Sequence, residues 1–284
     1  MALQKKSAAL LEQVQEIIDC YSFAISLRQI FYQLVVRQFI ANCEAQYHRV
    51  SRLCVIGRDE GILDEEAFAD RLRQPDKPSD WKDLPDFIDT VKSAYRKNKW
   101  QNQHDYVEIW TEKDALREVI TEITHQYGVN LLVVRGQVSR TAIYEAHERF
   151  SEKLDDGKNL YLYYMGDFDP SGLSIYNSLK ERLGNFGAAG DSINFERIAL
   201  TPEQIATYHL PHDPAKQTDP NYKKFVAEYG DNAVELDALP PDVLRNLIRE
   251  NIEQHIDNDI LLQVQKIEQE EKTQLQGFIN QLEL

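Results

Sequence analysis

Two aspartates, Asp167 and Asp169, are the residues best suited to chemistry, because they stand one residue apart after the β-prone run YLYY. Alternate residues near the end of a strand point to the same side, so the two carboxylates would repel each other without a cation. Hard carboxylate oxygens suit Mg²⁺, with Mn²⁺ as a substitute. A β-turn is the alternative interpretation, since the segment GDFDPSG is rich in turn-forming residues. If the two acids are exposed and repel each other, removing either should leave the fold intact.

Beyond residue 101, short β-prone segments alternate with amphipathic helices. This alternation predicts an α/β domain in which helices cover a parallel sheet. Ligands bind such sheets at the carboxyl ends of the strands. Glu112 ends the first predicted strand, and Asp167 and Asp169 end the third, so we expect these acids to meet at one edge of the sheet. The predicted strands cover residues 106–112, 130–136, 159–169 and 193–200.

Helical periodicity predicts three short helices before residue 62, at 6–21, 27–39 and 44–61, with Ser26 as the N-cap of the second. Three such helices in a neutral-to-basic segment suggest a helix-turn-helix or winged-helix module. On the third helix, a basic face lies opposite the apolar face. It is either a DNA-recognition surface or a solvated charged face, and its members are His48, Arg49 and Arg52.

Charge is distributed unevenly along the 284 residues. The formal net charge is −15, yet residues 1–100 sum to zero and residues 101–284 carry the entire excess. DNA binding is therefore permitted in the first third, whereas the acidic remainder would repel a duplex except where a metal ion lies between carboxylate and phosphate.

Three cysteines without CxxC spacing indicate neither a disulfide framework nor a zinc site. The sequence shows no signal peptide or membrane span, which favours a cytoplasmic, nucleoid-associated protein.

These patterns divide the chain into three expected parts. Residues 1–100 form a winged-helix DNA-binding domain, residues 101–200 an α/β domain, and residues 201–284 a helical extension. From Pro241 onwards, the extension carries a long apolar stripe, which needs another surface to cover it.

Glu112 and the residues KDAL that follow it, together with GDFDPSG, resemble the Toprim domain of topoisomerases, primases and related nucleases. The form is closest to the topoisomerase VI A subunit and its relative, the meiotic double-strand-break transesterase. In those families a winged helix precedes the Toprim domain and carries a nucleophilic tyrosine. Here the matching segment is RQIFY, from Arg28 to Tyr32, with Gln29 where the family usually has an acid. The resemblance spans roughly residues 24–200 and suggests a compact relative.

The resemblance implies that Tyr32 attacks a DNA phosphate and leaves a 5′-phosphotyrosyl enzyme. Tyr32 projects away from the apolar stripe of its helix, so we expect it to lie outside the core. Arg28, four residues earlier, is placed to bind a phosphate or to stabilise the phenolate. Glu112 would act as a metal ligand or as the acid–base for the 3′-oxygen. Arg135 and Arg140 would contact the DNA backbone.

The resemblance also implies partners. The tyrosine of one protomer works with the Toprim acids of the other, so a homodimer on double-stranded DNA is expected. The chain contains no GxxxxGK phosphate loop, and strand passage would therefore need a separate ATPase subunit.

Two alternatives remain at this point. One is a hydrolytic Toprim endonuclease in which water is the nucleophile and the winged helix only positions DNA. The other is a non-catalytic DNA-binding or assembly subunit. The presence of all three acids argues against a binding subunit, which does not need clustered carboxylates near phosphates.

Overall fold

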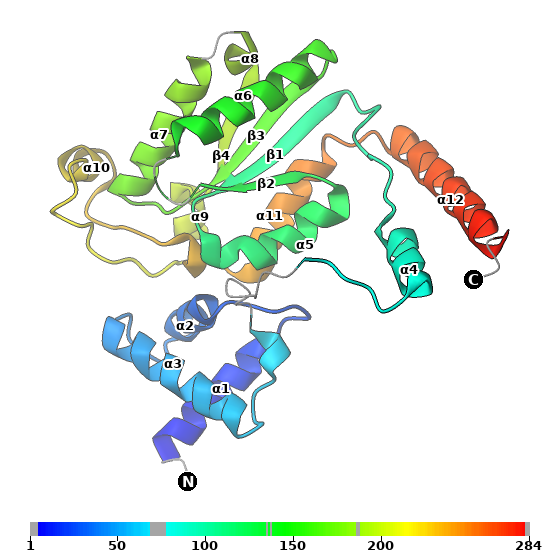
Figure 1. Cartoon of the computed structure of the whole chain (residues 1–284). Helices are drawn as coiled ribbons and strands as arrows, with labels where there is room; N and C mark the ends of the chain where they lie inside the picture. Colours follow the sequence, from blue (N-terminus) through cyan, green and yellow to red (C-terminus); the bar gives the residue numbers. More distant parts are fainter. Residues whose placement is uncertain (1–4, 69–77, 135, 137, 186–187, 282–284) are drawn as a thin grey trace.

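A four-stranded parallel sheet forms the centre of the computed structural model, which describes residues 5–68, 78–134, 136, 138–185 and 188–281 (Figure 1). The strand order is β2-β1-β3-β4, so the α/β class and the parallel sheet predicted from the sequence are confirmed. β1 and β3, which precede the candidate acids, are neighbours, and their last residues, Thr111 and Met165, are paired. The strands are β1 (Asp105–Thr111), β2 (Asn130–Val133), β3 (Asn159–Met165) and β4 (Ile193–Ala199).

Helices cover both faces of the sheet because alternate residues of the central strands are apolar on each side. Leu160, Leu162 and Tyr164 of β3 pack with α6 and α7, whereas Tyr163 and Met165 belong to the core that contains α5 and α11. The result is three layers, with α6 and α7 on one face and α5 and α11 on the other (Figure 1). The helices are α5 (Arg117–Tyr127), α6 (Arg140–Asp155), α7 (Pro170–Gly184), α8 (Ala188–Asp191) and α11 (Pro241–Glu253).

The N-terminal part contains the three predicted helices, α1 (Lys5–Asp19), α2 (Leu27–Val36) and α3 (Glu44–Asp59). Ser26 caps α2 as expected: its hydroxyl accepts a hydrogen bond from the Gln29 amide at 3.2 Å, and the Gln29 side chain accepts one from the Ser26 amide at 2.9 Å. After α3, the described residues to 68 form a short 3-10 turn, η1 (Glu65–Ala67), and an isolated bridge between Ile25 and Phe68. A single bridge is not the β-stranded wing of a winged-helix fold, so the winged helix stays a prediction.

The apolar stripe after Pro241 is divided between two helices. α11 buries Leu244, Ile248 and Ile252 in the same core as α5, and therefore completes the α/β unit. α12 (Asn258–Gln281) leaves the sheet and lies beside α4 (Leu84–Ala94) (Figure 1). In the part of the chain that is described, no helix is both long and apolar enough to cross a membrane. The remaining elements are η2 (Asp114–Leu116), α9 (Pro202–Thr207), α10 (Tyr222–Tyr229) and η3 (Leu236–Ala238).

Candidate functional site

Glu112 and Asp167 lie side by side where β1 and β3 end. The Glu112 amide donates to the Met165 carbonyl at 3.3 Å, which extends the pairing of the two strands by one residue. The Glu112 carboxylate accepts hydrogen bonds from the Asp167 amide and, at 3.1 Å, from the Tyr164 hydroxyl. Burial raises the pKa of Glu112, and these two bonds offset part of the effect. The predicted meeting at one edge of the sheet is therefore found for Glu112 and Asp167.

Two glycines allow this close approach. A Cβ atom on Gly166 would lie 2.8 Å from the Tyr164 ring and 3.0 Å from a Glu112 oxygen. A Cβ atom on Gly172 would lie 2.3 Å from the Asp167 carbonyl oxygen and 3.2 Å from the same Glu112 oxygen. Any larger residue at either position would push the acid-bearing loop away from Glu112. The packing around the candidate site therefore requires glycine at both of these positions in GDFDPSG.

Asp167 is held from two sides. Its Oδ1 accepts a hydrogen bond from the Leu236 amide at 2.7 Å, and its Oδ2 lies 3.0 Å from the Lys113 ammonium nitrogen. Burial raises the pKa of Asp167 to about 7, although the nearby Lys113 charge acts in the opposite direction. An ionised Asp167 is therefore costly in this environment, and a further cation would stabilise it.

Asp169 caps α7 with its side chain, because Oδ1 accepts a hydrogen bond from the Gly172 amide at 2.6 Å. This finding corrects the expectation that both aspartates are exposed acids whose loss leaves the fold intact. Asp169 is half-buried and satisfies an amide at the start of α7, and Asp167 is almost enclosed. Replacing Asp169 by alanine removes a helix cap, which typically costs about 1 kcal/mol.

Lys113, Glu235 and Asp237 join the site, and sequence reasoning assigned a role to none of them. The Lys113 nitrogen lies 3.1 Å from Glu235 and 3.2 Å from Asp237, in addition to Asp167. Burial acts to lower the pKa of Lys113, but the three surrounding carboxylates outweigh it and raise that pKa. The Asp237 side chain is fully buried, and its oxygens receive no well-aligned hydrogen bond from the described residues. The one signal in the sequence is the spacing of Glu235 and Asp237, which repeats that of the aspartate pair but follows no predicted strand.

Arg28 links this cluster to α2 and Tyr32. Its guanidinium pairs with Glu235, lies 4.0 Å from Asp237 and hydrogen-bonds to Tyr32. Tyr32 is only 4% exposed, which corrects the expectation that it lies outside the core. The helical periodicity of α2 identifies its own apolar stripe correctly, but η3 packs against α2 and the surrounding contacts enclose Tyr32 as well. Burial, followed by the charge of Glu235, raises the pKa of Tyr32 to about 12.

The donor set suits magnesium chemically, although the side chains are not arranged around a metal position. Glu112, Asp167 and Asp169 offer hard oxygens, and the raised pKa values of Glu112 and Asp167 show that added positive charge would stabilise them. Within the described residues, however, no three acidic, histidine or cysteine side chains converge closely enough to hold an ion. The Lys113 ammonium stands next to Asp167 instead. Metal binding would therefore require the Asp167 and Asp169 side chains to turn.

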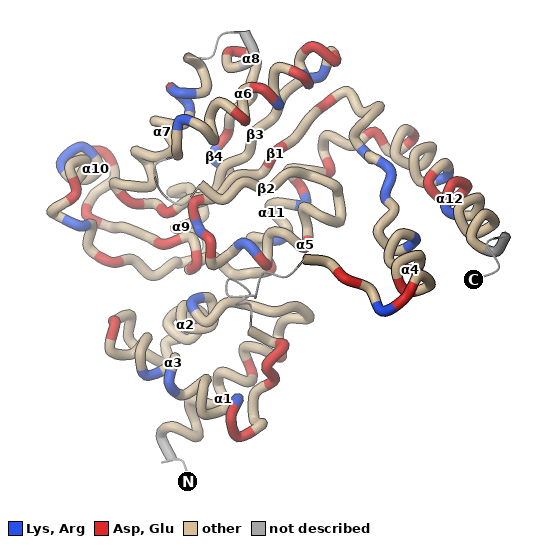
Figure 2. Tube along the Cα trace, viewed as in Figure 1, with Lys and Arg blue, Asp and Glu red and all other residues tan. Residues whose placement is uncertain are grey.

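The candidate DNA-contacting residues of α3 are largely accessible. His48 and Arg52 are exposed and Arg49 is half-buried, while Val55 and Ile56 are exposed on the same helix. Figure 2 shows basic residues on α3, on α7, on α10 and in the segment between α4 and β1, with acidic residues spread over the whole molecule. Arg140 is exposed at the start of α6, and Arg135 lies outside the described residues.

A cleft of about 980 Å³ lies between the N-terminal helices and the segment of η2 and α5. Arg28, Arg58 and Arg117 line it together with the rings of Phe23 and Tyr47. The three guanidiniums have acidic partners within the chain, so the cleft is electrostatically balanced rather than strongly positive. These pairs are Arg28 with Glu235, Arg58 with Glu65 and Arg117 with Asp114.

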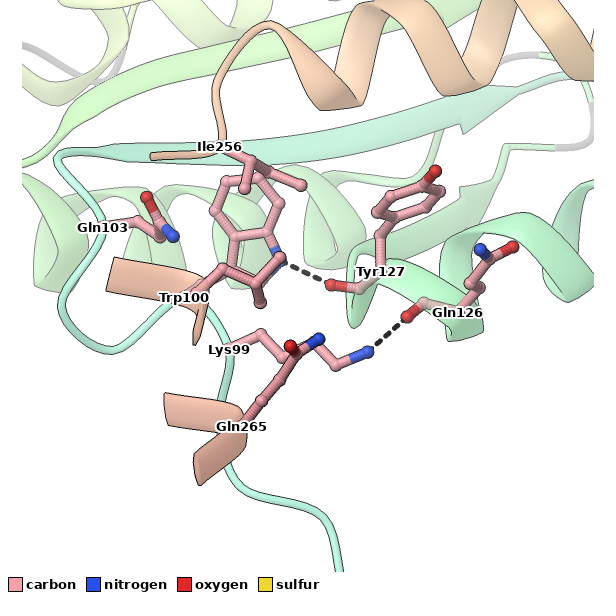
Figure 3. A pocket seen from close by; sticks show the side chains of 8 residues that line it. Lys99, Trp100, Gln103, Gln126, Tyr127, Ile256 and Gln265 are labelled. Atoms are coloured by element: carbon pink, nitrogen blue, oxygen red, sulfur yellow. Dashed lines mark hydrogen bonds between the residues drawn. The ribbon is translucent and has the colours of Figure 1, made fainter. Parts of the chain in front are cut away.

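A smaller cavity, of about 130 Å³, lies away from the acids, where the segment before β1 meets the end of α5 and the start of α12 (Figure 3). The Trp100 indole donates to the Tyr127 carbonyl at 2.8 Å, and the Lys99 ammonium donates to the Gln126 carbonyl. These bonds tie the segment to α5. The cavity is too small for a nucleotide and is not lined by acids, so we do not assign a reaction to it.

A scan against protein-family models gave no match, and a search of curated proteins found none with significant similarity.

Proposed function

We propose that this protein is a magnesium-dependent enzyme that cleaves double-stranded DNA by transesterification, with Tyr32 as the nucleophile. The observation that carries the proposal is the meeting of Glu112 and Asp167 at the ends of neighbouring strands, with Asp169 two residues further on. Buried carboxylates with raised pKa values are typical of sites that act on charged substrates through a cation. The resemblance to the topoisomerase VI A subunit supports DNA as the substrate.

In the proposed reaction, the Tyr32 oxygen forms a bond to the DNA phosphorus while the bond from phosphorus to the 3′-oxygen breaks. The enzyme stays attached to the 5′ end, and the phenolic proton passes to solvent. Glu112 delivers a proton to the departing 3′-oxygen, a role that its raised pKa favours. When bound to Asp167 and Asp169, Mg²⁺ would neutralise charge on the phosphate. Arg28 would hold the phosphate and favour the phenolate.

This reaction requires α2 to separate from η3. Tyr32 is buried, and its hydroxyl is held by Arg28, which is paired with Glu235. Through Lys113, Glu235 is also linked to Asp167 of the same chain. We propose that DNA phosphates compete with Glu235 for Arg28 and release α2, which then presents Tyr32 to the acids of a second protomer. Strand passage would in addition need a separate ATPase subunit.

A second candidate function is hydrolysis of DNA at the same acids, with water as the nucleophile. The specific observation in its favour is the burial of Tyr32, whose pKa of about 12 makes the phenol a weak nucleophile at neutral pH. In this case the bond from phosphorus to the 3′-oxygen breaks as a water oxygen binds to phosphorus, and no covalent adduct forms.

Cleavage of supercoiled plasmid in the presence of Mg²⁺ tests whether the acids catalyse a reaction. Wild-type protein should produce nicked or linear DNA, and Asp169→Asn should do so at least about 100-fold more slowly. Asparagine is also a good helix cap, so this variant should keep the stability of α7, whereas Asp169→Ala should lose about 1 kcal/mol. Asp156→Asn, at the end of α6, is the control and should cleave normally. Full activity of Asp169→Asn would rule out the metal assignment; rescue by Mn²⁺ would not.

A further inference from the structure

Phe168, the residue between the two aspartates, lines a pocket of about 480 Å³. Its backbone is fixed by an isolated bridge to Val234, with hydrogen bonds of 2.8 and 2.9 Å. The pocket lies between the first turns of α7, the end of β4 and helix α10. Its volume is in the range of sites that hold small organic ligands. The loop that carries the candidate acids therefore also forms part of a cavity.

Aromatic rings form much of the lining of this pocket. Phe168 lies 5.1 Å from Tyr229 and 5.6 Å from Phe225, measured between ring centroids. Phe168 and Phe225 are buried, but Tyr229 is 40% exposed and can offer a ring face to a ligand. Tyr176 of α7 also lines the pocket. Flat, accessible rings of this kind bind planar heterocycles by stacking.

Polar groups stand on the same lining. Asn177 and Asn221 carry amides that both donate and accept hydrogen bonds, and Glu228 can accept from an exocyclic amine. Lys224 supplies positive charge, and it is exposed. Arg197 joins the pocket to the acid loop, because its guanidinium donates to the carbonyls of Gly166 at 2.8 Å and Asp167 at 2.6 Å.

We propose that this pocket binds one unpaired nucleobase of the DNA strand whose phosphate lies at the acids. The inference depends on the proposed function, because it places a base beside the phosphate on which Asp167 and Asp169 act. Phe168 is covalently linked to both aspartates, and consecutive Cα atoms are about 3.8 Å apart. The Phe168 ring lies 5.1 Å from the Tyr229 ring, so a base stacked on Tyr229 would be held beside the loop that carries the acids. The enzyme would hold the strand by unstacking a base, which costs least where the DNA is already single-stranded or distorted.

Photocrosslinking of the full chain tests this assignment. The probe is a single-stranded oligonucleotide of about 15 thymidines in which 5-iodo-deoxyuridine replaces one base, with Ca²⁺ in place of Mg²⁺. Irradiation should attach the probe to the peptide that contains Phe225 and Tyr229, as mapped by mass spectrometry. Tyr229→Ala should reduce the crosslink and weaken binding of the probe about 10-fold. Tyr144→Ala, which removes an exposed ring on α6, should change neither.

Lys224→Ala provides a second variant that changes an exposed side chain and should weaken binding of the probe several-fold. Circular dichroism melting should show both pocket variants folded. If the protein binds the probe and cleaves plasmid, but crosslinks lie elsewhere and Tyr229→Ala binds normally, the pocket assignment is wrong and the proposed function stands. If the wild type neither binds the probe nor cleaves plasmid, both are wrong.

Discussion

The negative charge of Asp167 is unfavourable in the folded protein. It is nearly enclosed, and burial raises its pKa even though Lys113 stands 3.0 Å away. Lys113 is itself shared among Asp167, Glu235 and Asp237, so its single charge cannot neutralise all three. Arg28 already pairs with Glu235 and lies 4.0 Å from Asp237, so two cationic side chains face three carboxylates, and a divalent cation would balance the remaining excess of negative charge. This excess is the physical reason to expect metal binding at the acids.

The unfolding free energy should change with pH because ionised Asp167 is unfavourable in the folded protein. The pKa of Asp167 is about 7 in the folded chain, against an ordinary value of 3.8, so the folded state holds the proton more tightly than the unfolded state. The stability gained from protonation is fully present below about pH 3.8 and is lost as the pH rises through about 7. In EDTA, the unfolding free energy of the wild type should therefore rise from about pH 7.5 to about pH 5, relative to Asp167→Asn. The gain is at most about 1.4 kcal/mol per unit of pKa difference.

Urea unfolding of both proteins at each pH measures this difference. Asparagine does not titrate, so subtracting the two curves removes the contributions of acids that do not interact with Asp167. Parallel curves across this range would contradict a raised pKa for Asp167.

At the scale of elements, the candidate site depends on how α7 begins. The helix starts immediately after Asp169, and Gly172 in its first turn lies against the Asp167 carbonyl and Glu112. The start of α7, the acid loop and the end of β1 are thus packed as one unit. Adding one methyl group there should therefore shift the carboxylates.

Gly172→Ala tests that packing. The added Cβ would lie 2.3 Å from the Asp167 carbonyl oxygen, so the loop must shift. We expect a loss of about 1–3 kcal/mol in unfolding free energy and a large loss of plasmid cleavage. Gly184→Ala, at the end of the same helix, is a matched control because nothing lies within 4 Å of its added Cβ. If Gly172→Ala were as stable as Gly184→Ala in thermal melts, the close packing described here would be wrong.

The elements that carry the acids could be predicted because their signals are local. Strand periodicity before Glu112 and Asp167, and helical periodicity after them, determine where β1, β3 and their following helices lie. In a parallel sheet, residues at the ends of neighbouring strands must meet. The same local rules place Ser26 at the start of α2.

The rest of the site could not be predicted, because it depends on contacts between distant segments. Glu235 lies more than two hundred residues from Arg28 in the sequence, and nothing in either segment signals that they pair. The burial of Tyr32 follows from the packing of η3 on α2. The periodicity of α2 alone does not predict this contact. Gln29, which stands where the resembled family has an acid, completes the cap of α2, a structural role that becomes evident from its bonds to Ser26.

At the scale of the whole molecule, α12 presents apolar side chains to solvent. Leu262 and Phe278 are 62% and 65% exposed, and Ile267 is 40% exposed. Ile267 and Phe278 lie on the same side of the helix, about 20° apart, whereas Leu262 lies on another side. Exposed apolar residues that share one side of a helix are typical of an association surface. Together with the shared site proposed for Tyr32, they favour a homodimer.

Sedimentation of the purified protein at micromolar concentration should therefore show a dimer. A charge on the side of α12 that carries Ile267 and Phe278, as in Phe278→Glu, should shift the protein towards monomer and reduce double-strand cleavage, because two sites must act together. Tyr144→Glu, which places a charge at an exposed position on α6 instead, should leave the dimer unchanged. A wild-type monomer that persists with DNA bound would remove the support for a site shared between protomers.

Covalent capture of DNA tests the central claim, that Tyr32 is the nucleophile of a magnesium-dependent transesterase. A duplex labelled at its 3′ ends, which stay joined to a 5′-phosphotyrosyl enzyme, is incubated with protein and Mg²⁺, denatured with detergent and separated on a denaturing gel. The wild type should carry label, and Tyr32→Phe should not, because the phenyl ring keeps the packing but removes the attacking oxygen. Arg28→Ala should lose part of the adduct, whereas Gln33→Ala should keep most of it. If Tyr32→Phe cleaves DNA at the wild-type rate and no adduct is found, the enzyme uses water and the central claim is wrong.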